Sequence, residues 1–394
     1  MIIKIQTHEL RIGMYVHKLE VFWLKHPLVH NAMLLTTQQQ IDTVTESSIQ
    51  EVWIDLEKGR GPDIAPAEAQ AHPQQSVAKG LTGMHEEIMQ AQAICLNAKG
   101  QVMSMFSDAR LGKTIDTDST LPLVDEIGGS LSRHPAALLS VVRLKTHDDY
   151  TYLHSVAVCA LMVSLARQLN LDDAQTRLAG TAGLLHDVGK AGISIDILNK
   201  PGKLTAEEFD IMKQHPVFGE ALLRKSGGSD AVLDVALHHH EKINGSGYPH
   251  GLKGKAISQL ARMAAICDVY DAVTSNRPYK AGWNPASAMS QMASWEGHFD
   301  QKIFYAFVKA VGIYPVGSVV RLASGRIAVV VEPGQDSLLL PKVCVFYSLS
   351  ASRMLRPETV DLADRYCWDS IVGPEENNVW AKMNLDLLWL KPVA

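Results

Sequence analysis

The apolar residues of this chain recur with two different periods, and the change of period divides the sequence. In the central region they repeat at helical spacing, which predicts helices near 150–169, 173–188, 206–213, 216–225, 229–240, 257–274, 285–295 and 300–311. After residue 317 apolar and polar residues alternate, with SerGly and ProGly between the runs. That alternation predicts a small antiparallel β extension over 317–394.

The first 79 residues read as a small domain followed by a linker. Over 1–59, IIKIQ and EVWIDLEKG alternate like strands and QQQIDTVTESSI is a short helical candidate, so this part should be an α+β domain of the regulatory type. Residues 60–79 are rich in Pro, Ala and Gln with almost no large apolar residues, which is typical of a linker.

Residues 80–145 are predicted to form a helical connector. Its methionines at 84, 89, 103 and 105 could form a partner or dimer surface, although core packing is the favoured interpretation. Thr117, Asp118 and Ser119 are candidate caps for the helix around LPLVDEIGGSL.

Composition narrows the class of protein. A length of 394 residues suits two or three domains, and a net charge of -5 argues against a sequence-independent nucleic-acid binder. The five cysteines are scattered without a CxxC pair, as expected of reduced thiols in a cytoplasmic protein. No apolar run reaches about 18 residues, so no transmembrane helix is expected. The N-terminus carries charges early and alternates, unlike a signal peptide.

The stretch from His186 to Lys190, HDVGK, closes the helical run TRLAGTAGLLHDVGK. His186 and Asp187 are adjacent, so their side chains diverge by about 100° around a helix axis, and Lys190 returns to the same face one turn later. A buried group of this kind is costly unless its charges are paired or bound to a metal. Read alone, the dipeptide fits a solvated helix end equally well.

Further imidazoles and carboxylates recur in apolar helical surroundings. They are His154, His215, His239, His240 and Asp268. These side chains are ligands that transition metals accept, and two metals about 3.5–4 Å apart form a clamp for an in-line displacement at phosphorus. The set as a whole, more than any one member, predicts a dinuclear metal site.

Four segments together resemble the HD-GYP family of bacterial cyclic di-GMP phosphodiesterases, a branch of the HD hydrolases. The segments are HDVGK, the HisPro at 215–216, HHEKINGSGYP at 239–249 and CDVYDAVTSNRPYK at 267–280. LRIGMYV at 10–16 and VWIDLEKG at 52–59 resemble the small N-terminal domain of one HD-GYP subgroup. The resemblance implies a mainly α fold, with an all-helical HD-type catalytic domain over 146–316 between the small α+β domain and the β extension.

The resemblance also implies a ligand set for two divalent ions, Fe or Mn. One ion would be bound by His154, His186 and Asp268. The second would be bound by His215, His239 and His240. Asp187 would be shared between the two ions, which makes it catalytic as well as a ligand.

Other residues take substrate or supporting roles by the same resemblance. Lys190 would act on the phosphate or the leaving group, while Arg277 and Lys280 would bind phosphate. Asp271 is expected to orient a ligand histidine, Glu241 to do likewise or to hold the loop 241–256, and His238 to be structural. That loop, glycine-rich and basic, could cover a phosphate-bearing ligand or be a solvated hairpin.

Two ions are expected instead of the three that some members hold. The third ion needs a carboxylate one helical turn before the first ligand histidine, and Tyr150 stands there. A neutral phenol is a poor ligand at pH 7, so Tyr150 is expected to line the substrate side of the pocket. Asp149 lies about 100° away on the helix.

The expected function is a metal-dependent phosphodiesterase that converts cyclic di-GMP to linear pGpG, GMP or both. The alternative is a catalytically lapsed module that responds to cyclic di-GMP or binds a partner, but the intact ligand set favours the enzyme. Diguanylate cyclase-type proteins could bind through Gly247-Tyr248-Pro249, and the chain could form a homodimer.

Overall fold

In the computed structural model the chain forms two compact units, 1–78 and 79–394. The structure describes residues 2–19, 33–38, 41–42, 45, 51–55, 58, 83–144, 150–275, 282–334, 337–375, 380 and 383–390. The predicted fold class, a mainly α protein with an α+β N-terminal domain and a C-terminal antiparallel extension, is confirmed.

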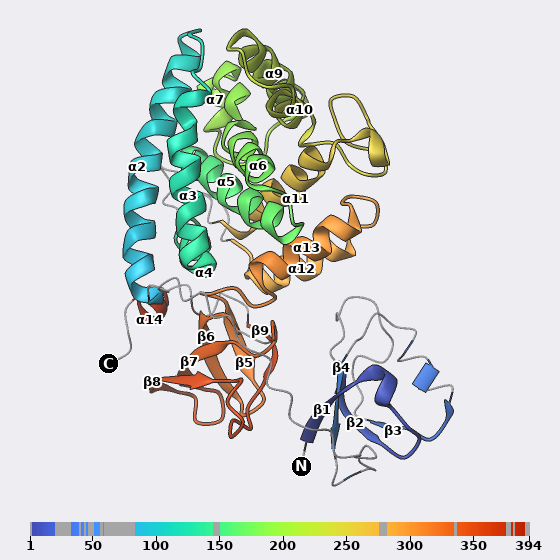
Figure 1. The fold of residues 1–394 in the computed structure, drawn as a ribbon. Helices are drawn as coiled ribbons and strands as arrows, with labels where there is room; N and C mark the ends of the chain where they lie inside the picture. The colour runs from blue at the N-terminus through green and yellow to red at the C-terminus, as the bar shows by residue number, and fades with distance from the viewer. Residues whose placement is uncertain are drawn as a thin grey trace. The chain divides into compact units, whose positions relative to one another are not determined.

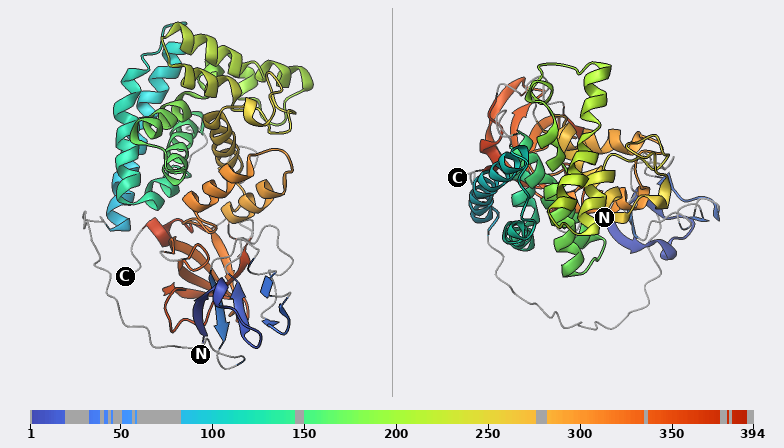
Figure 2. Two further views of the ribbon diagram at one scale, coloured as in Figure 1. Left: turned by 45° about the vertical axis from the view of Figure 1, so that its right-hand side comes forward. Right: turned by 90° about the horizontal axis from the view of Figure 1, so that it is seen from above.

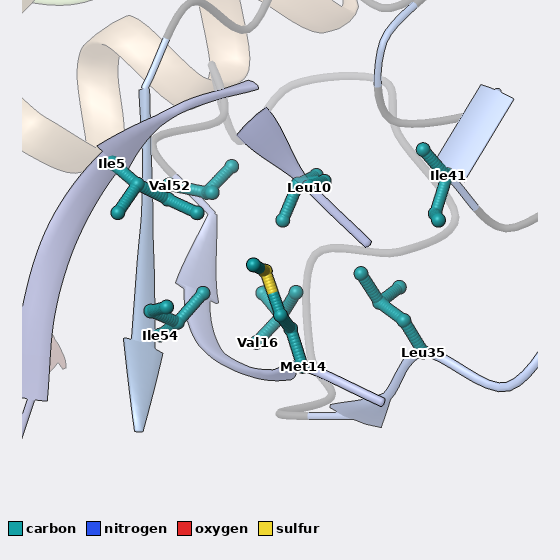
Figure 3. Packing of buried hydrophobic residues seen from close by; sticks show 8 residues of the cluster. All are labelled: Ile5, Leu10, Met14, Val16, Leu35, Ile41, Val52 and Ile54. Carbon is teal, nitrogen blue, oxygen red and sulfur yellow. The ribbon is translucent and has the colours of Figure 1, made fainter. Parts of the chain in front are cut away.

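The first unit is built on an antiparallel sheet in the order β1-β4-β2-β3. Its strands are β1 Ile2–Gln6, β2 Tyr15–Leu19, β3 Met33–Leu34 and β4 Glu51–Asp55. Alternate positions of β4, Val52 and Ile54, join Ile5, Leu10, Met14, Val16, Leu35 and Ile41 in one buried cluster (Figure 3). The helix predicted over QQQIDTVTESSI lies mostly outside the described residues.

The second unit begins with α2 Met84–Arg110, α3 Leu121–Arg133 and α4 Pro135–Val141, and α2 and α3 run side by side in Figure 1. Met89 and Met103 are 57% and 41% exposed, so the core-packing interpretation of the methionines is wrong for these two. The reason is register, because Ile88, Val102 and their helical neighbours form the buried face one residue away.

The turn before α3 is capped by a residue other than the three expected. The Oδ1 atom of Asp116 accepts hydrogen bonds from the backbone N–H groups of Asp118 and Ser119, at 3.1 and 3.3 Å. Residues 118–120 then form one 3-10 turn, η2, and no side chain caps the start of α3. The predicted capping by Thr117, Asp118 or Ser119 is therefore wrong.

The rest of the helical region contains α5, which is buried on nearly every side and contacts α2, α3, α4, α6, α11 and α13, together with the helices that follow it. They are α5 Tyr150–Gln168, α6 Asp173–Leu185, η4 Val188–Gly192, α7 Ile195–Leu198, α8 Ala206–Met212, α9 His215–Lys225, α10 Asp230–His238, η5 Gly254–Ala256, α11 Gln259–Thr274, α12 Pro285–Ser294 and α13 Gln301–Val311. The helix predicted to reach residue 188 ends at Leu185, and α7 was not predicted.

The chain then forms an antiparallel sheet in the order β8-β7-β6-β5-β9, which lies near α4 and α12 in Figure 1 and in the left-hand view of Figure 2. Its strands are β5 Val319–Leu322, β6 Arg326–Glu332, β7 Lys342–Ser348, β8 Arg353–Asp361 and β9 Ile371–Pro374, and α14 Leu387–Leu390 contacts β6. Among the described residues, no helix has both the length and the apolarity needed to cross a membrane.

Candidate metal centre

Most of the predicted ligands lie at or near helix ends, and the packing of separate helices brings them together. His154 is in the second turn of α5, and His186 and Asp187 lie between the last residue of α6 and η4. His215 is the first residue of α9, and His239 and His240 directly follow α10. Asp268 comes from the third turn of α11. Helix packing around α5 thus brings side chains separated by more than 100 residues to one point.

Asp187 lies between two pairs of imidazoles and is 1% exposed. Its Oδ2 atom is 3.4 Å from Nε2 of His154 and 3.5 Å from Nε2 of His186. Its Oδ1 atom is 3.3 Å from Nε2 of His215 and 3.8 Å from Nε2 of His239. Each carboxylate oxygen therefore faces its own pair of nitrogens, which is the arrangement that a carboxylate shared by two ions requires.

Asp268 completes one side of the cluster. Its Oδ1 atom lies 3.1 Å from Nε2 of His154 and 3.9 Å from Nε2 of His186, and its Oδ2 atom lies 3.7 Å from Nδ1 of His240. Three sets of described residues have ligand atoms within 4.8 Å of one another: His154, His186 and Asp268; His186, Asp187 and His239; and His215, His239 and His240.

The histidines are oriented by their second ring nitrogens. Nδ1 of His186 lies 2.7 Å from the carbonyl oxygen of Gly183, and Nδ1 of His215 lies 2.7 Å from that of Met212. Nδ1 of His239 lies 3.0 Å from the carbonyl oxygen of Ala236. Since a carbonyl only accepts, each Nδ1 must carry a proton, so that in the neutral ring Nε2 keeps its lone pair.

The inner atoms of these side chains are mostly acceptors, which can bind a metal ion but cannot form hydrogen bonds with one another. The Nε2 atoms of His215 and His239 are 3.3 Å apart. With both lone pairs facing inward they cannot form a hydrogen bond. Nε2 of His186 and Oδ1 of Asp187 are likewise buried without a hydrogen-bond partner. Unsatisfied buried atoms of this kind are costly, and a divalent cation accepted by imidazole and carboxylate would remove the cost.

Burial keeps most of the imidazoles neutral. It lowers the pKa of His186, holds that of His239 well below the usual range, and lowers that of His240 to about 3. Burial also lowers the pKa of His154, but hydrogen bonds with Asp187, Asp268 and Asp271 outweigh it and raise the pKa to about 10. In the protein without metal, a proton on Nε2 of His154 thus occupies a place between carboxylates that suits a cation.

The two aspartates remain ionised in spite of their burial. Burial raises the pKa of Asp187, but the charge of Lys190 and the hydrogen bond from His154 contribute to holding it well below the usual range. Lys190 donates a hydrogen bond to Oδ2 of Asp187. Burial also raises the pKa of Asp268, but the hydrogen bond with His154 is the largest of several effects that hold this pKa well below the usual range. Both carboxylates are therefore in the form that binds metal.

Asp271 and Glu241 support the cluster from outside it. Oδ2 of Asp271 is 2.7 Å from Nδ1 of His154, which orients that ring as expected. Glu241 accepts hydrogen bonds from the backbone N–H groups of His250, at 2.7 Å, and Leu252, at 3.0 Å. Of the two roles considered for Glu241, these contacts support holding the loop.

The loop 241–256 folds back against the end of α10. The rings of His240 and Tyr248 are 4.7 Å apart between centroids, so the tyrosine covers one face of a cluster histidine. A side chain at Gly247 would place its Cβ 2.5 Å from the Cα of Glu241 and is therefore excluded. His238 lies apart from the cluster, with Nδ1 2.7 Å from Oδ1 of Asp234 and Nε2 3.0 Å from Nδ1 of His250.

The structure leaves some predicted positions open and adds one that was missed. Arg277, Lys280 and Asp149 lie outside the described residues, and so does the side chain of Tyr150, although its backbone begins α5. The missed position is Gly189, whose Cβ would lie 1.9 Å from the carbonyl oxygen of His215. The glycine in HDVGK was the signal, but its partner on α9 could not be read from the sequence.

Residues 131–303 match the HD domain family, and residues 2–120 match a domain of unknown function, DUF3391. Cyclic di-GMP phosphodiesterase PA4108 of Pseudomonas aeruginosa is 51% identical over 99% of this chain and 96% of its own length. The cyclic di-GMP phosphodiesterase response regulator RpfG of Xanthomonas campestris is 42% identical over 37% of this chain and 39% of its own. The 3'3'-cGAMP-specific phosphodiesterase 3 of Vibrio cholerae is 36% identical over 43% of this chain and 37% of its own.

The HD domain match and the buried His/Asp cluster define a hydrolase of the metal-dependent HD class. The 51% identity to the Pseudomonas protein identifies a particular family within that class, because the match spans the small N-terminal domain as well as the catalytic one. The chain belongs to the HD-GYP family of cyclic di-GMP phosphodiesterases. It is therefore an enzyme of the phosphodiesterase type, and its family implies divalent metal ions.

Proposed function

We propose that this chain hydrolyses cyclic di-GMP to pGpG, GMP or both at a dinuclear metal centre. The observation that carries the proposal is the position of Asp187, whose two oxygens face separate pairs of Nε2 atoms at 3.3–3.8 Å. Divalent ions bound there would supply charge neutralisation for a phosphodiester and an activated water. The near full-length relationship to a cyclic di-GMP phosphodiesterase supports the choice of substrate.

The proposed ligand sets follow the geometry of the cluster. His154, His186 and Asp268 bind one ion. His215, His239 and His240 bind the other. Asp187 is shared between them. Backbone carbonyl groups keep the Nε2 atoms of His186, His215 and His239 directed inward, so these ligands are already oriented for an ion.

Lys190 is proposed to act on the substrate. Its amine hydrogen-bonds to Oδ2 of Asp187, yet its side chain is 24% exposed whereas Asp187 is 1% exposed. It therefore stands where the buried cluster opens toward solvent. From there it can stabilise charge on a phosphate oxygen or protonate the leaving group.

Arg277, Lys280 and Tyr150 remain proposed substrate contacts. Arg277 and Lys280 are argued from the family motif, and Tyr150 from its position one helical turn before His154. A kinetic test separates Arg277 from the ligands. Arg277→Ala should raise KM or lower kcat while the metal content stays at the wild-type value, because the guanidinium is assigned to phosphate and not to an ion. Loss of metal from this variant would move Arg277 into the ligand network.

The metal is proposed to be Fe or Mn, since mixed imidazole and carboxylate ligands suit these ions. A cytoplasmic location is proposed because all five cysteines are free thiols, four of them buried. Binding of a diguanylate cyclase-type protein through Gly247-Tyr248-Pro249, and homodimer formation, are further proposals. The exposed methionines Met89 and Met103 on α2 offer a surface for the second of these.

The deciding experiment combines metal analysis of protein purified without oxygen with chromatography of the reaction products. We expect about two metals per chain and conversion of cyclic di-GMP in preference to 3'3'-cGAMP supplied at the same concentration. Full metal occupancy without hydrolysis of either substrate would favour the lapsed module. Faster hydrolysis of 3'3'-cGAMP would overturn the substrate assignment but leave the metal centre in place.

A further inference from the structure

A cavity of about 230 Å³ lies where the helical domain meets the β extension. Its walls come from α4, α11, α13 and the connection between β6 and β7, all within the second unit. One of its lining residues is Asp271, whose carboxylate is hydrogen-bonded to His154, so the cavity is separated from the candidate metal ligands by a single side chain. The proposed reaction makes no use of this cavity.

The lining has a definite chemical character. Most of it is apolar, with Leu139, Val316 and Leu338 contributed by three separate segments. Two cations, Arg143 and Lys309, also line it. Of the described lining residues only Asp271 is acidic, and its Oδ2 atom is already bonded to His154. The cavity therefore suits an apolar body that carries a negative charge.

One further polar atom is available to a ligand. Nδ1 of His134, another lining residue, is buried and has no hydrogen-bond partner. Burial lowers the pKa of His134, so its ring is neutral and one nitrogen can accept or donate a hydrogen bond. Arg143, in contrast, is partly engaged, since it donates to the carbonyl of Val316 at 2.8 Å. Lys309, which is exposed at the rim, is the cation best placed to meet an incoming anion.

Size limits the ligand further. A dry cavity of roughly 150 Å³ is large enough for benzene, so 230 Å³ admits one ring with a small substituent. We propose that this cavity is a binding site for a small apolar carboxylate, such as a monocyclic aromatic acid, with its ring among the apolar residues and its charge toward Lys309 and Arg143.

Occupancy of the cavity should be felt at the metal centre. Asp271 lines the cavity and orients His154, and an apolar ligand would exclude water from beside that hydrogen bond and strengthen it. A bound ligand is therefore expected to tighten metal binding by about three- to tenfold. This consequence rests on the proposed role of His154 as a ligand, whereas binding to the cavity does not.

The binding test uses the full chain and three probes that differ in charge: benzoate, benzyl alcohol and benzylamine. Saturation-transfer NMR and calorimetry should show benzoate bound with a Kd of about 1 mM and the other two at least about fivefold more weakly. Lys309→Gln should weaken benzoate binding by about five- to tenfold. Lys302→Gln, also exposed and on the same helix, is the matched control and should leave it unchanged.

A second variant closes the cavity. Ala310→Trp should abolish benzoate binding while the melting temperature and the bound metal remain close to wild type. Absence of benzoate binding to the wild type, equal binding of all three probes, or indifference to both Lys309→Gln and Ala310→Trp would overturn the site. These results are obtained whether or not cyclic di-GMP is hydrolysed, so they are separate from a failure of the proposed function.

The coupling is measured by titrating metal-free protein with Mn²⁺ with and without benzoate. The expected tightening should disappear in Lys309→Gln, which excludes direct action of benzoate on the ion. Benzoate binding without any change in Mn²⁺ affinity would overturn the link through Asp271.

Discussion

Two buried polar clusters in the second unit differ in how their hydrogen bonds are satisfied. Glu87 of α2 is fully buried and accepts hydrogen bonds from Ser130, at 2.7 Å, and from two nitrogens of Arg133, at 2.7 and 2.9 Å. Asp187 is as deeply buried, but most of its neighbours are Nε2 atoms, and its Oδ1 atom has no hydrogen-bond partner. Donors match acceptors in the first cluster, whereas in the second Nε2 of His186 and Oδ1 of Asp187 are left without a donor.

The difference separates a structural polar cluster from a functional one. In the Glu87 cluster the chain itself supplies both partners, so nothing further is needed for stability. In the Asp187 cluster the hydrogen bonds from the Nδ1 atoms orient the rings, whereas Nε2 of His186 and Oδ1 of Asp187 have no hydrogen-bond partner. Removal of a central residue should therefore cost stability in one cluster, and metal and activity in the other.

The largest effect is expected from Asp187→Ala. Hydrolysis of cyclic di-GMP should fall on the order of 10,000-fold or more, and the bound metal should fall with it, because the shared carboxylate serves both ions. Metal analysis and product chromatography would measure the two losses. Asp125→Ala, which removes an exposed carboxylate paired with Arg177, is the control and should change neither. Wild-type metal content in Asp187→Ala would contradict the assignment.

A smaller effect on the same cluster is expected from Asp271→Asn. This change weakens the acceptor behind His154 and should lower metal affinity by about 10- to 100-fold without unfolding the protein. Competition with a chelator would measure the affinity. His238→Gln is the matched control, since His238 neighbours a ligand yet pairs with Asp234, and its metal affinity should match wild type. Equal losses in both variants would mean that the effect is general and not transmitted through His154.

The Glu87 cluster should respond in the opposite manner. Glu87→Gln removes the charge that Arg133 pairs with and should lower the free energy of unfolding by about 1–3 kcal/mol. Metal content and kcat of the folded fraction should remain at wild-type values. Urea denaturation followed by circular dichroism measures the stability. Loss of metal from a folded Glu87→Gln protein would break the distinction between the clusters.

The smallest effect is expected in the β extension, where Asp369 accepts hydrogen bonds from Ser324, Arg326 and the backbone of Ser370. Burial raises the pKa of Asp369, but the bonds from Ser324 and Arg326 outweigh it and lower the pKa below the usual value. The stabilisation is then present above an ordinary aspartate pKa of about 3.9 and is lost as the pH falls further.

Asp369→Asn should therefore cost about 1 kcal/mol near pH 7. The gap between the two proteins should narrow as the pH falls below about 4, since only the wild type loses a charge. Thermal unfolding followed across this pH range measures the gap. A gap that stayed constant down to pH 2 would show that the charge of Asp369 contributes nothing.

The sequence was most informative where the chemistry is local. The helices that carry His154, His215 and Asp268 were predicted to within a residue or two, because their apolar residues repeat regularly between clear breaks. The grouping of the candidate ligands followed from residue type and family motif. That they meet around one carboxylate depends on helix packing, which no local pattern specifies.

The errors have a common physical cause, which is competition between local pattern and tertiary contacts. The apolar period predicted that α6 would continue to residue 188, but the helix ends at Leu185 and a 3-10 turn begins at Val188, with His186 and Asp187 between them. Met89 and Met103 look like core residues by type, yet they lie beside the buried face of α2. The cavity next to Asp271 had no sequence signal, since its walls come from segments far apart in the chain.

The contact between Gly189 and α9 limits which amino acids can replace glycine at positions 189 and 219. A Cβ at Gly189 would lie 1.9 Å from the carbonyl oxygen of His215, whereas one at Gly219 would lie 3.2 Å from the nearest atom, the backbone nitrogen of Gly189. Main chain thus touches main chain between the segments that carry Asp187 and His215. A gene library randomised at both positions and selected for activity should return only glycine at 189, but glycine or alanine at 219. The distance between the two ligand segments therefore depends on position 189 having no side chain.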